Sequence, residues 1–298
     1  MRSVRVRVPA KINLHLGVGA PRDDGFHELV TVFQAVDLTD EITATESVGL
    51  ELRISGVDGL STGADNLAWQ AASLLAESHQ IPPNVALHLR KSIPVAGGMA
   101  GGSADAAGTL LACATLWRTD SSRAELASLA AELGSDVPFA LAGGTALGTG
   151  RGDQLTPALS TGEFNWVLAL APFGISAADA YAELDRQRES GTALSPLGPP
   201  DDLLDALRAG DVERVGAALG NDLQAAALTL APTLRKTLRA GVELGALAGI
   251  VSGSGPTCAF LCADAEEAAG LAASLAAEGV CRTTRIAVGP APGARVIG

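Results

Sequence analysis

The sequence predicts an α+β protein with two domains, and three observations lead to that prediction. First, its 298 residues suffice for two domains at roughly 100–200 residues each. Second, strand-like and helical segments alternate in the first half around a glycine-rich loop. Third, a strand pattern restarts near Glu163 and leads into the mixed order of a split βαβ sandwich. We therefore expect an N-terminal mixed α/β domain over residues 1–160 and a C-terminal ferredoxin-like sandwich over residues 161–298.

The first half begins with apolar residues that alternate through positions 3–18, which predicts two strands interrupted near Pro9 and Ala10. Lys11 and Asn13 fall on the polar face of the second strand. Further strands are expected at 28–38, 48–55 and 85–89, and helices at 66–79, 103–117 and 123–133.

The second half mixes strands and helices. Strands are expected at 166–171, 257–262 and 281–288, with another before residue 252; helices are expected at 176–189, 201–208, 211–218, 231–244 and 264–277. Residues 191–200 are rich in Pro, Gly and Ser and predict a loop.

Composition narrows the class of protein. Hydrophobic residues make up 47% of the chain and charged residues 18%, which predicts a folded core. The 21 basic and 33 acidic residues give a net charge of −12, which argues against general binding to nucleic acid or an anionic membrane. No apolar run approaches the roughly 18 residues of a membrane span, and no secretory segment is evident. We expect a cytoplasmic protein whose partners are small molecules.

Cysteine and lysine are both scarce. Four cysteines are too few for a disulfide scaffold, and no CxxC pair or HExxH motif provides a metal site, so no metal ligand is assigned. Lys11, Lys91 and Lys236 are the only lysines. A lysine inside a strand is usually a solvated edge residue. Because lysine is rare in this chain, however, Lys11 is a candidate functional residue.

The strongest motif is a glycine-rich loop that follows a strand and precedes a helix. It consists of Pro94-Val95-Ala96-Gly97-Gly98-Met99-Ala100-Gly101-Gly102-Ser103-Ala104. Glycine permits a left-handed backbone and close approach of a ligand, and a helix N-terminus adds free N–H groups. A phosphate site is therefore expected; the alternative is a tightly packed structural loop. Ser103 is a candidate helix cap or phosphate or metal ligand. The loop is neither a Walker A motif nor a GxGxxG fingerprint.

Two further motifs are weaker when taken alone. Asp136 lies among apolar residues in Gly134–Phe139, where an N-cap role, with Ser135 as a rival cap, is at least as plausible as catalysis. Ser252–Pro256 is a second loop of small residues, for which an ordinary turn is the default interpretation.

Taken together, these motifs resemble the GHMP kinases, named for galactokinase, homoserine kinase, mevalonate kinase and phosphomevalonate kinase. The resemblance rests on Pro9–Leu14, the 94–104 loop, Gly134–Phe139 and Ser252–Pro256, which follow in the family's order along nearly the whole chain. The segment Asp24–Leu29 resembles the branch of the family that phosphorylates a cytidine-diphosphate-linked alcohol.

The resemblance implies a two-domain fold and ATP-dependent phosphorylation of the 2-hydroxyl of 4-diphosphocytidyl-2-C-methyl-D-erythritol, with Mg²⁺ as cofactor. This reaction belongs to non-mevalonate isoprenoid precursor synthesis. Lys11 and Asp136 match the family's catalytic pair, and Asn13 is placed to orient the substrate. Residues 94–104 match the ATP phosphate loop, and Lys91 matches a position near the nucleotide.

The same resemblance assigns Phe26, His27 and Tyr181 to the cytosine ring of the substrate. Two positions depart from the family pattern. Phe26 stands where tyrosine is frequent, and Ala177 stands where a hydroxyl residue is frequent. Both departures concern the detail of cytidine binding and leave the class of reaction unchanged.

Phosphoryl transfer needs positioning and neutralisation of charge more than covalent chemistry. Asp136 is expected to accept the proton of the attacking hydroxyl, and Lys11 to supply a point cation. A carboxylate at a helix N-terminus is stabilised in its charged form and is a weaker base, so the alternative is that Lys11 acts chiefly by polarising the hydroxyl.

Two rival functions remain at this point. One is another kinase of the same superfamily, such as homoserine kinase or a mevalonate-pathway kinase, and the Phe26–His27 segment argues against it. The other is a non-catalytic nucleotide- or anion-binding protein, and the presence of both Lys11 and Asp136 argues against that.

Replacing Gly101 or Gly102 with Val is expected to abolish ATP binding, because a branched Cβ blocks both a left-handed backbone and close approach of the phosphates. Calorimetric titration of the folded variants with ATP measures this. Near-normal ATP affinity in a folded Gly102→Val protein contradicts the prediction of a phosphate loop.

Overall fold

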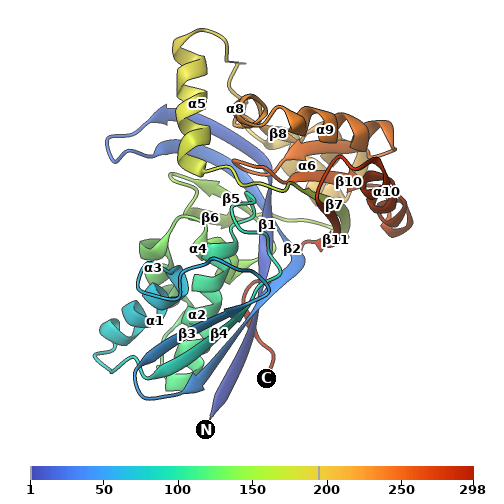
Figure 1. The fold of residues 1–298 in the computed structure, drawn as a ribbon. Helices are drawn as coiled ribbons and strands as arrows, with labels where there is room; N and C mark the ends of the chain where they lie inside the picture. Colours follow the sequence, from blue (N-terminus) through green and yellow to red (C-terminus); the bar gives the residue numbers. More distant parts are fainter. Residues whose placement is uncertain (1, 194) are drawn as a thin grey trace.

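The computed structural model describes residues 2–193 and 195–298, which form two sheets and their covering helices (Figure 1). The larger sheet is eight-stranded and follows the path β12-β1-β2-β4-β3, with β5 and β6 attached beside β2 and β8 beside β1. Its strands are β1 (Ser3–Pro21), β2 (His27–Glu46), β3 (Leu50–Ser55), β4 (Val85–Arg90), β5 (Thr145–Thr149), β6 (Gln154–Pro157), β8 (Gly220–Asn221) and β12 (Arg295–Val296). Its helices are α1 (Leu67–Ser78), α2 (Gly101–Trp117), α3 (Arg123–Leu133) and α4 (Val137–Ala142).

The smaller sheet belongs to the second half of the chain. Its strands are β7 (Phe164–Leu170), β9 (Ala248–Val251), β10 (Cys258–Cys262) and β11 (Thr283–Gly289), and its helices are α5 (Ala177–Glu189), α6 (Asp201–Ala209), α7 (Val212–Ala217), α8 (Gln224–Leu230), α9 (Thr233–Glu243) and α10 (Ala265–Glu278). The order β11-β7-β10-β9 is antiparallel throughout. Counted within this half, that order is 4-1-3-2, the arrangement of a ferredoxin-like sandwich. The predicted fold class is confirmed.

The first strand differs from its prediction. β1 is one strand of 19 residues and not two. Its pairing with β2 shifts register between Pro9 and Ala10 and then resumes. Proline lacks an N–H, so the ladder slips at this point without ending, and a bulge replaces the expected break.

Other segments also differ from the predictions. The sequence pattern missed α8, the β5–β6 hairpin and the short strands β8 and β12. Because β8 and β12 both pair with β1, two segments of the second half complete the first sheet. The domain division near residue 160 stays a prediction. Among the described residues, no helix is long and apolar enough to cross a membrane.

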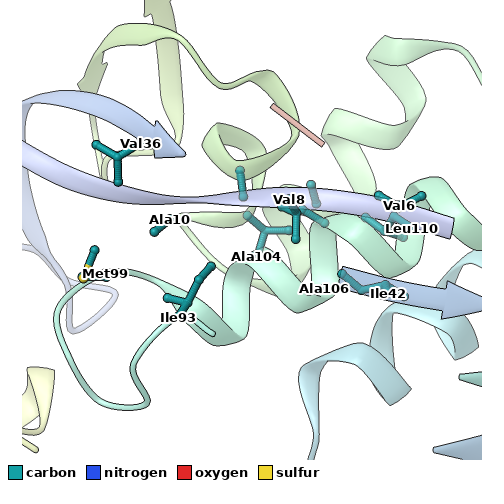
Figure 2. Close-up of a cluster of buried hydrophobic side chains, with 14 of the residues drawn as sticks. Val6, Val8, Ala10, Val36, Ile42, Ile93, Met99, Ala104, Ala106 and Leu110 are labelled. Atoms are coloured by element: carbon teal, nitrogen blue, oxygen red, sulfur yellow. The ribbon is translucent and has the colours of Figure 1, made fainter. Parts of the chain in front are cut away.

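Helix α2 packs across β1 and β2 and forms the main core (Figure 2). Val6 and Val8 of β1, Ile42 of β2 and Leu110 of α2 are all fully buried. Gly108 permits this close approach, because a Cβ there would lie 2.4 Å from Ile42 Cδ1.

The glycine-rich loop is anchored in the same core. Ile93 and Met99, near its two ends, are each 2% exposed or less. Both side chains belong to the same buried cluster as Ala10 and Val36 of the sheet, and Figure 2 labels all four. Full burial of such a side chain contributes about 1.5–3 kcal/mol, so the loop is held against the sheet from both ends.

Candidate active site

The glycine-rich loop connects β4 to α2, and its backbone is left-handed at three positions. The φ angles are 51° at Ala96, 72° at Gly98 and 57° at Ala100. Gly101 and Gly102 lie in the first turn of α2 and are not left-handed. The left-handed part of the reason for the valine prediction was therefore wrong at these two glycines. The other part, close approach of a phosphate to the backbone, still applies.

The N-terminus of α2 leaves several amides free for an anion. The helix begins at Gly101, two residues earlier than predicted, and Ala100 at its N-cap supplies no side-chain hydrogen bond. The amides of Gly101, Gly102 and Ser103 therefore have no carbonyl one turn earlier to receive them. The Ser103 hydroxyl does not cap the helix. These donors and the dipole of a 17-residue helix suit a phosphate.

Lys11 is a buried residue in the middle of β1 and not a solvated edge residue. It is 7% exposed, and its Nζ donates to Asn13 Oδ1 at 2.6 Å. Asn13 Nδ2 in turn donates to Thr31 Oγ1 at 2.9 Å, and that hydroxyl donates to the carbonyl of His15 at 2.7 Å. A chain of hydrogen bonds thus fixes both the Lys11 ammonium and the Asn13 amide.

Asp136 faces Lys11 across 3.7 Å between Oδ2 and Nζ. Although Asp136 occupies the N-cap position of α4, its side chain makes no capping hydrogen bond. Its side chain is 30% exposed, whereas that of Lys11 is 8% exposed. Both residues line one cavity of about 350 Å³, together with Asn13. A buried cation, a more accessible carboxylate and an amide therefore meet in one place.

The late loop of small residues, Ser252–Pro256, packs against this cavity. Ser252 Oγ donates to the carbonyl of Gly98 at 3.1 Å. Gly253 has a φ of 55°, and a Cβ there would lie 3.1 Å from Asn13 Oδ1 and 3.4 Å from Lys11 Nζ. The loop is more than an ordinary turn, because it joins the second half of the chain to the glycine-rich loop and to Lys11.

His27 and Tyr181 form one cluster beside the cavity. Their rings stack with centroids 5.0 Å apart and planes at 21°. His27 Nε2 lies 2.9 Å from Asp185 Oδ1, which follows Tyr181 by one turn of α5. Tyr181 lines the cavity, and burial raises the pKa of its hydroxyl, with the charge of Asp136 adding to the rise.

Phe26 lies apart from that cluster. Its side chain is half-exposed at 49%, and its ring is stacked 5.0 Å from the guanidinium carbon of Arg151. Arg151 itself lines the cavity that holds Lys11 and Asp136. The structure therefore brings His27 and Tyr181 together directly, and it connects Phe26 to the cavity through an arginine.

Lys91 is buried beneath the glycine-rich loop. Its Nζ donates to Asp40, to Asp105 Oδ2 at 2.5 Å and to the carbonyl of Gly101 at 3.2 Å. Asp40 Oδ1 also accepts from the backbone N–H of Ile93 at 2.9 Å. The ammonium group thus ties the end of β4 to the first turn of α2 and supports the loop from below.

Two carboxylates share this one ammonium group. Burial raises the pKa of Asp105 to about 7; the Lys91 ammonium opposes the rise, and the charge of Asp40 adds to it. Asp105 Oδ1 is buried with no hydrogen-bond partner among the described residues. The neutral form of Asp105 therefore suits this site at slightly acid pH.

Sequence reasoning missed five polar residues of this region. They are Thr31, Asp40, Asp105, Arg151 and Asp185. Most of their contacts join segments far apart in the chain, such as the contact of Asp185 with His27. Asp105 alone gave a local signal, because it is an isolated acid near the start of an alanine-rich helix.

Comparison with known proteins agrees with the fold. The family model described as GHMP kinases N terminal domain matches residues 66–144, and the one described as GHMP kinases C terminal matches residues 203–281. A homoserine kinase from Cytophaga hutchinsonii shares the fold with a TM-score of 0.76 at 18% identity, covering 100% of this chain and 98% of that one. The chain therefore belongs to the GHMP kinase family.

Within that family, two relatives that are more than half identical to this chain carry the same name. A protein from Saccharopolyspora erythraea named 4-diphosphocytidyl-2-C-methyl-D-erythritol kinase is 56% identical, covering 99% of this chain and 94% of the relative. A protein of the same name from Mycobacterium marinum is 58% identical, covering 99% and 92%. A crystal structure of 4-(cytidine 5'-diphospho)-2C-methyl-D-erythritol kinase is 31% identical with a TM-score of 0.79, covering 95% and 98%.

The raised pKa of Asp105 predicts a pH-dependent stability. The folded protein keeps this proton to about pH 7, whereas the ordinary value is 3.8, so the contribution of Asp105 to stability falls as pH rises between these values. Asp105→Asn removes that dependence. Relative to wild type, the variant should gain roughly 1–3 kcal/mol of unfolding free energy between pH 5 and pH 8, by urea denaturation.

Thr109→Val is the matched control, since it is a buried position on the same helix that carries no titrating group. Its difference from wild type should be the same at both pH values. A difference for Asp105→Asn that also stays constant contradicts the assignment of a raised pKa.

Proposed function

We propose that this chain transfers the γ-phosphoryl group of ATP to the 2-hydroxyl of 4-diphosphocytidyl-2-C-methyl-D-erythritol. The observation that carries the proposal is the pair of Lys11 and Asp136, 3.7 Å apart in a cavity beside the glycine-rich loop. The name shared by the nearly full-length relatives supports the choice of alcohol. We propose a cytoplasmic location for the protein, because its co-substrate ATP is available there.

The nucleotide site follows from the loop. The phosphates of ATP bind the amides of Gly101, Gly102 and Ser103 at the start of α2. A cavity of about 260 Å³ includes Gly101 and Gly102 and continues along Leu67 and Asn66. We assign the base and ribose to this cavity, because the two glycines which the phosphates approach line it.

Mg²⁺ is the proposed cofactor. Mg²⁺ is usually held by one or two carboxylates together with substrate phosphates, and it neutralises charge on the transferring group when bound. The Ser103 hydroxyl, at the start of α2 where the phosphates bind, is the candidate oxygen donor from this chain. Residues 2–193 and 195–298 contain no cluster of three His, Cys, Asp or Glu side chains suited to a metal ion.

Asp136 acts as the base. Its carboxylate makes no capping bond to α4, so its oxygens are available to accept the proton of the attacking hydroxyl. Lys11 stabilises the negative charge that develops between the hydroxyl and the phosphoryl group. Asn13, held by Lys11 and Thr31, orients the alcohol. His27 and Tyr181 hold the cytosine end.

A phosphotransfer assay with ATP tests the proposal directly. The cytidyl alcohol, homoserine and mevalonate are offered in parallel, and ADP release and the phosphorylated product are both measured. Turnover of the cytidyl alcohol alone is expected. Preference for homoserine or mevalonate overturns the substrate, and ATP binding without any turnover favours a non-catalytic protein.

Asp136→Asn should keep the fold and both ligand affinities but lose about 10²–10⁴ in turnover, the usual contribution of a general base. Lys11→Met should show a comparable loss, and the double variant should lose less than the product of the two, because both residues act on one hydroxyl. Steady-state kinetics with both substrates varied separates kcat from KM. A fully active Asp136→Asn enzyme refutes the proposed base.

Phe26→Ala should lower kcat/KM for the cytidyl substrate about tenfold or more, in line with base stacking worth about 1–3 kcal/mol. The KM for ATP should stay nearly unchanged, and Phe26→Tyr should be tolerated because it keeps the ring face. The measurement is kcat/KM of both variants at saturating ATP. Equal losses of ATP and cytidyl binding show instead that Phe26 has a structural role.

A further inference from the structure

Arg151 is a cation of the catalytic cavity to which no role has been assigned. It lies in the turn between β5 and β6 and lines the cavity of about 350 Å³ together with Lys11 and Asp136. Among the described residues that line this cavity, Lys11 and Arg151 are the only lysine or arginine side chains. Lys11 already contacts Asn13 and Asp136. Arg151 is therefore the cation of this cavity that is available to another part of the substrate.

The turn that carries Arg151 holds the guanidinium in place. Nε and Nη2 of Arg151 both donate to Asp153 Oδ2, at 3.2 and 2.9 Å. The carbonyl of Gly150 accepts from the backbone N–H of Leu29 at 2.7 Å, which ties the turn to β2. Nη1 makes no hydrogen bond in the described part of the chain, and the side chain is 32% exposed. The guanidinium is thus fixed on one edge and open on the other.

Arg151 also touches the other end of the proposed substrate site. Its guanidinium carbon lies 5.0 Å from the centre of the Phe26 ring. One side chain therefore lines the cavity of Asp136 and also contacts the aromatic ring assigned to the cytidine end. In the cytidyl alcohol, the group between the base and the reacting end is a diphosphate.

We propose that Arg151 binds the diphosphate of the cytidyl substrate and positions the alcohol for transfer. This inference rests on the proposed function. Arginine matches phosphate oxygens with a planar set of donors, and its open edge supplies them here. The chain carries a net charge of −12, so an anionic substrate must meet a local cation. Binding energy from this remote group then positions the 2-hydroxyl for attack.

Inhibition by cytidine and by CDP tests the proposal, because the two ligands share the base and differ in the diphosphate. Both are measured as competitive inhibitors against the cytidyl substrate at saturating ATP. Arg151→Ala should weaken CDP about 10- to 100-fold, the scale of hydrogen bonds to charged groups, and leave cytidine nearly unchanged. Arg151→Lys should weaken CDP less, because it keeps the charge and loses the planar donors.

Arg22→Ala is the matched control. Arg22 lies in the turn next to Phe26 and pairs with Glu28 and Asp24, so its removal changes the same net charge in the same region. It should leave inhibition by CDP and by cytidine nearly unchanged. An unchanged KM for ATP in both variants shows that each has folded.

The contrary results are distinct. Equal weakening of CDP and cytidine by Arg151→Ala shows that Arg151 acts only through Phe26 and overturns the proposal. Unchanged CDP inhibition, or equal weakening of CDP by Arg22→Ala, also overturns it. If the wild-type enzyme neither uses the cytidyl alcohol nor binds CDP, the proposed function itself fails; if the wild type binds CDP and Arg151→Ala binds it equally, only this inference fails.

Discussion

The structure depends on a buried ammonium group in the middle of its first strand. β1 is almost wholly buried from Val6 to Val18, and Lys11 sits within that stretch. A charge in such a place is costly unless partners surround it. Its partners come from separate segments: Asn13 from β1 itself, Asp136 from the start of α4, and the Gly253 loop packed beside it. Folding the strand therefore assembles the site.

A second buried lysine serves a different purpose. Lys91 is enclosed by Asp40 and Asp105 at the base of the glycine-rich loop and borders the cavity proposed for the nucleotide, whereas Lys11 lines the cavity that contains Asp136. Lys236, the third lysine, is exposed. A buried pair with excellent hydrogen bonds fixes geometry more than it adds stability. Lys91 thus fixes the position of the glycine-rich loop, and Lys11 lies in the cavity beside that loop.

Local pattern predicted most elements, because alternation and helical spacing reflect which side of each segment meets the core. The local pattern failed where contacts between distant segments override a local preference. Pro9 interrupts one hydrogen bond but not a strand held by β2, and Ala96 and Ala100 have a left-handed backbone although neither is a glycine. The motifs of the site were visible in the sequence. Arg151 and Asp185 were not, because their partners lie elsewhere in the chain, and the proposed residue roles and the domain boundary remain predictions.

The position of Asp136 shows how the fold and the chemistry compete for one side chain. An aspartate at an N-cap ordinarily accepts from the amides of the first turn and contributes about 0.5–2 kcal/mol. Here the side chain makes no such bond, and one carboxylate oxygen lies 3.7 Å from the Lys11 ammonium. Helix α4 has only six residues, and the Asp136 side chain does not stabilise it as a cap. The Asp136 carboxylate faces a buried cation and the cavity instead of the first turn of α4. This departure from the capping rule supports a base more strongly than the motif alone.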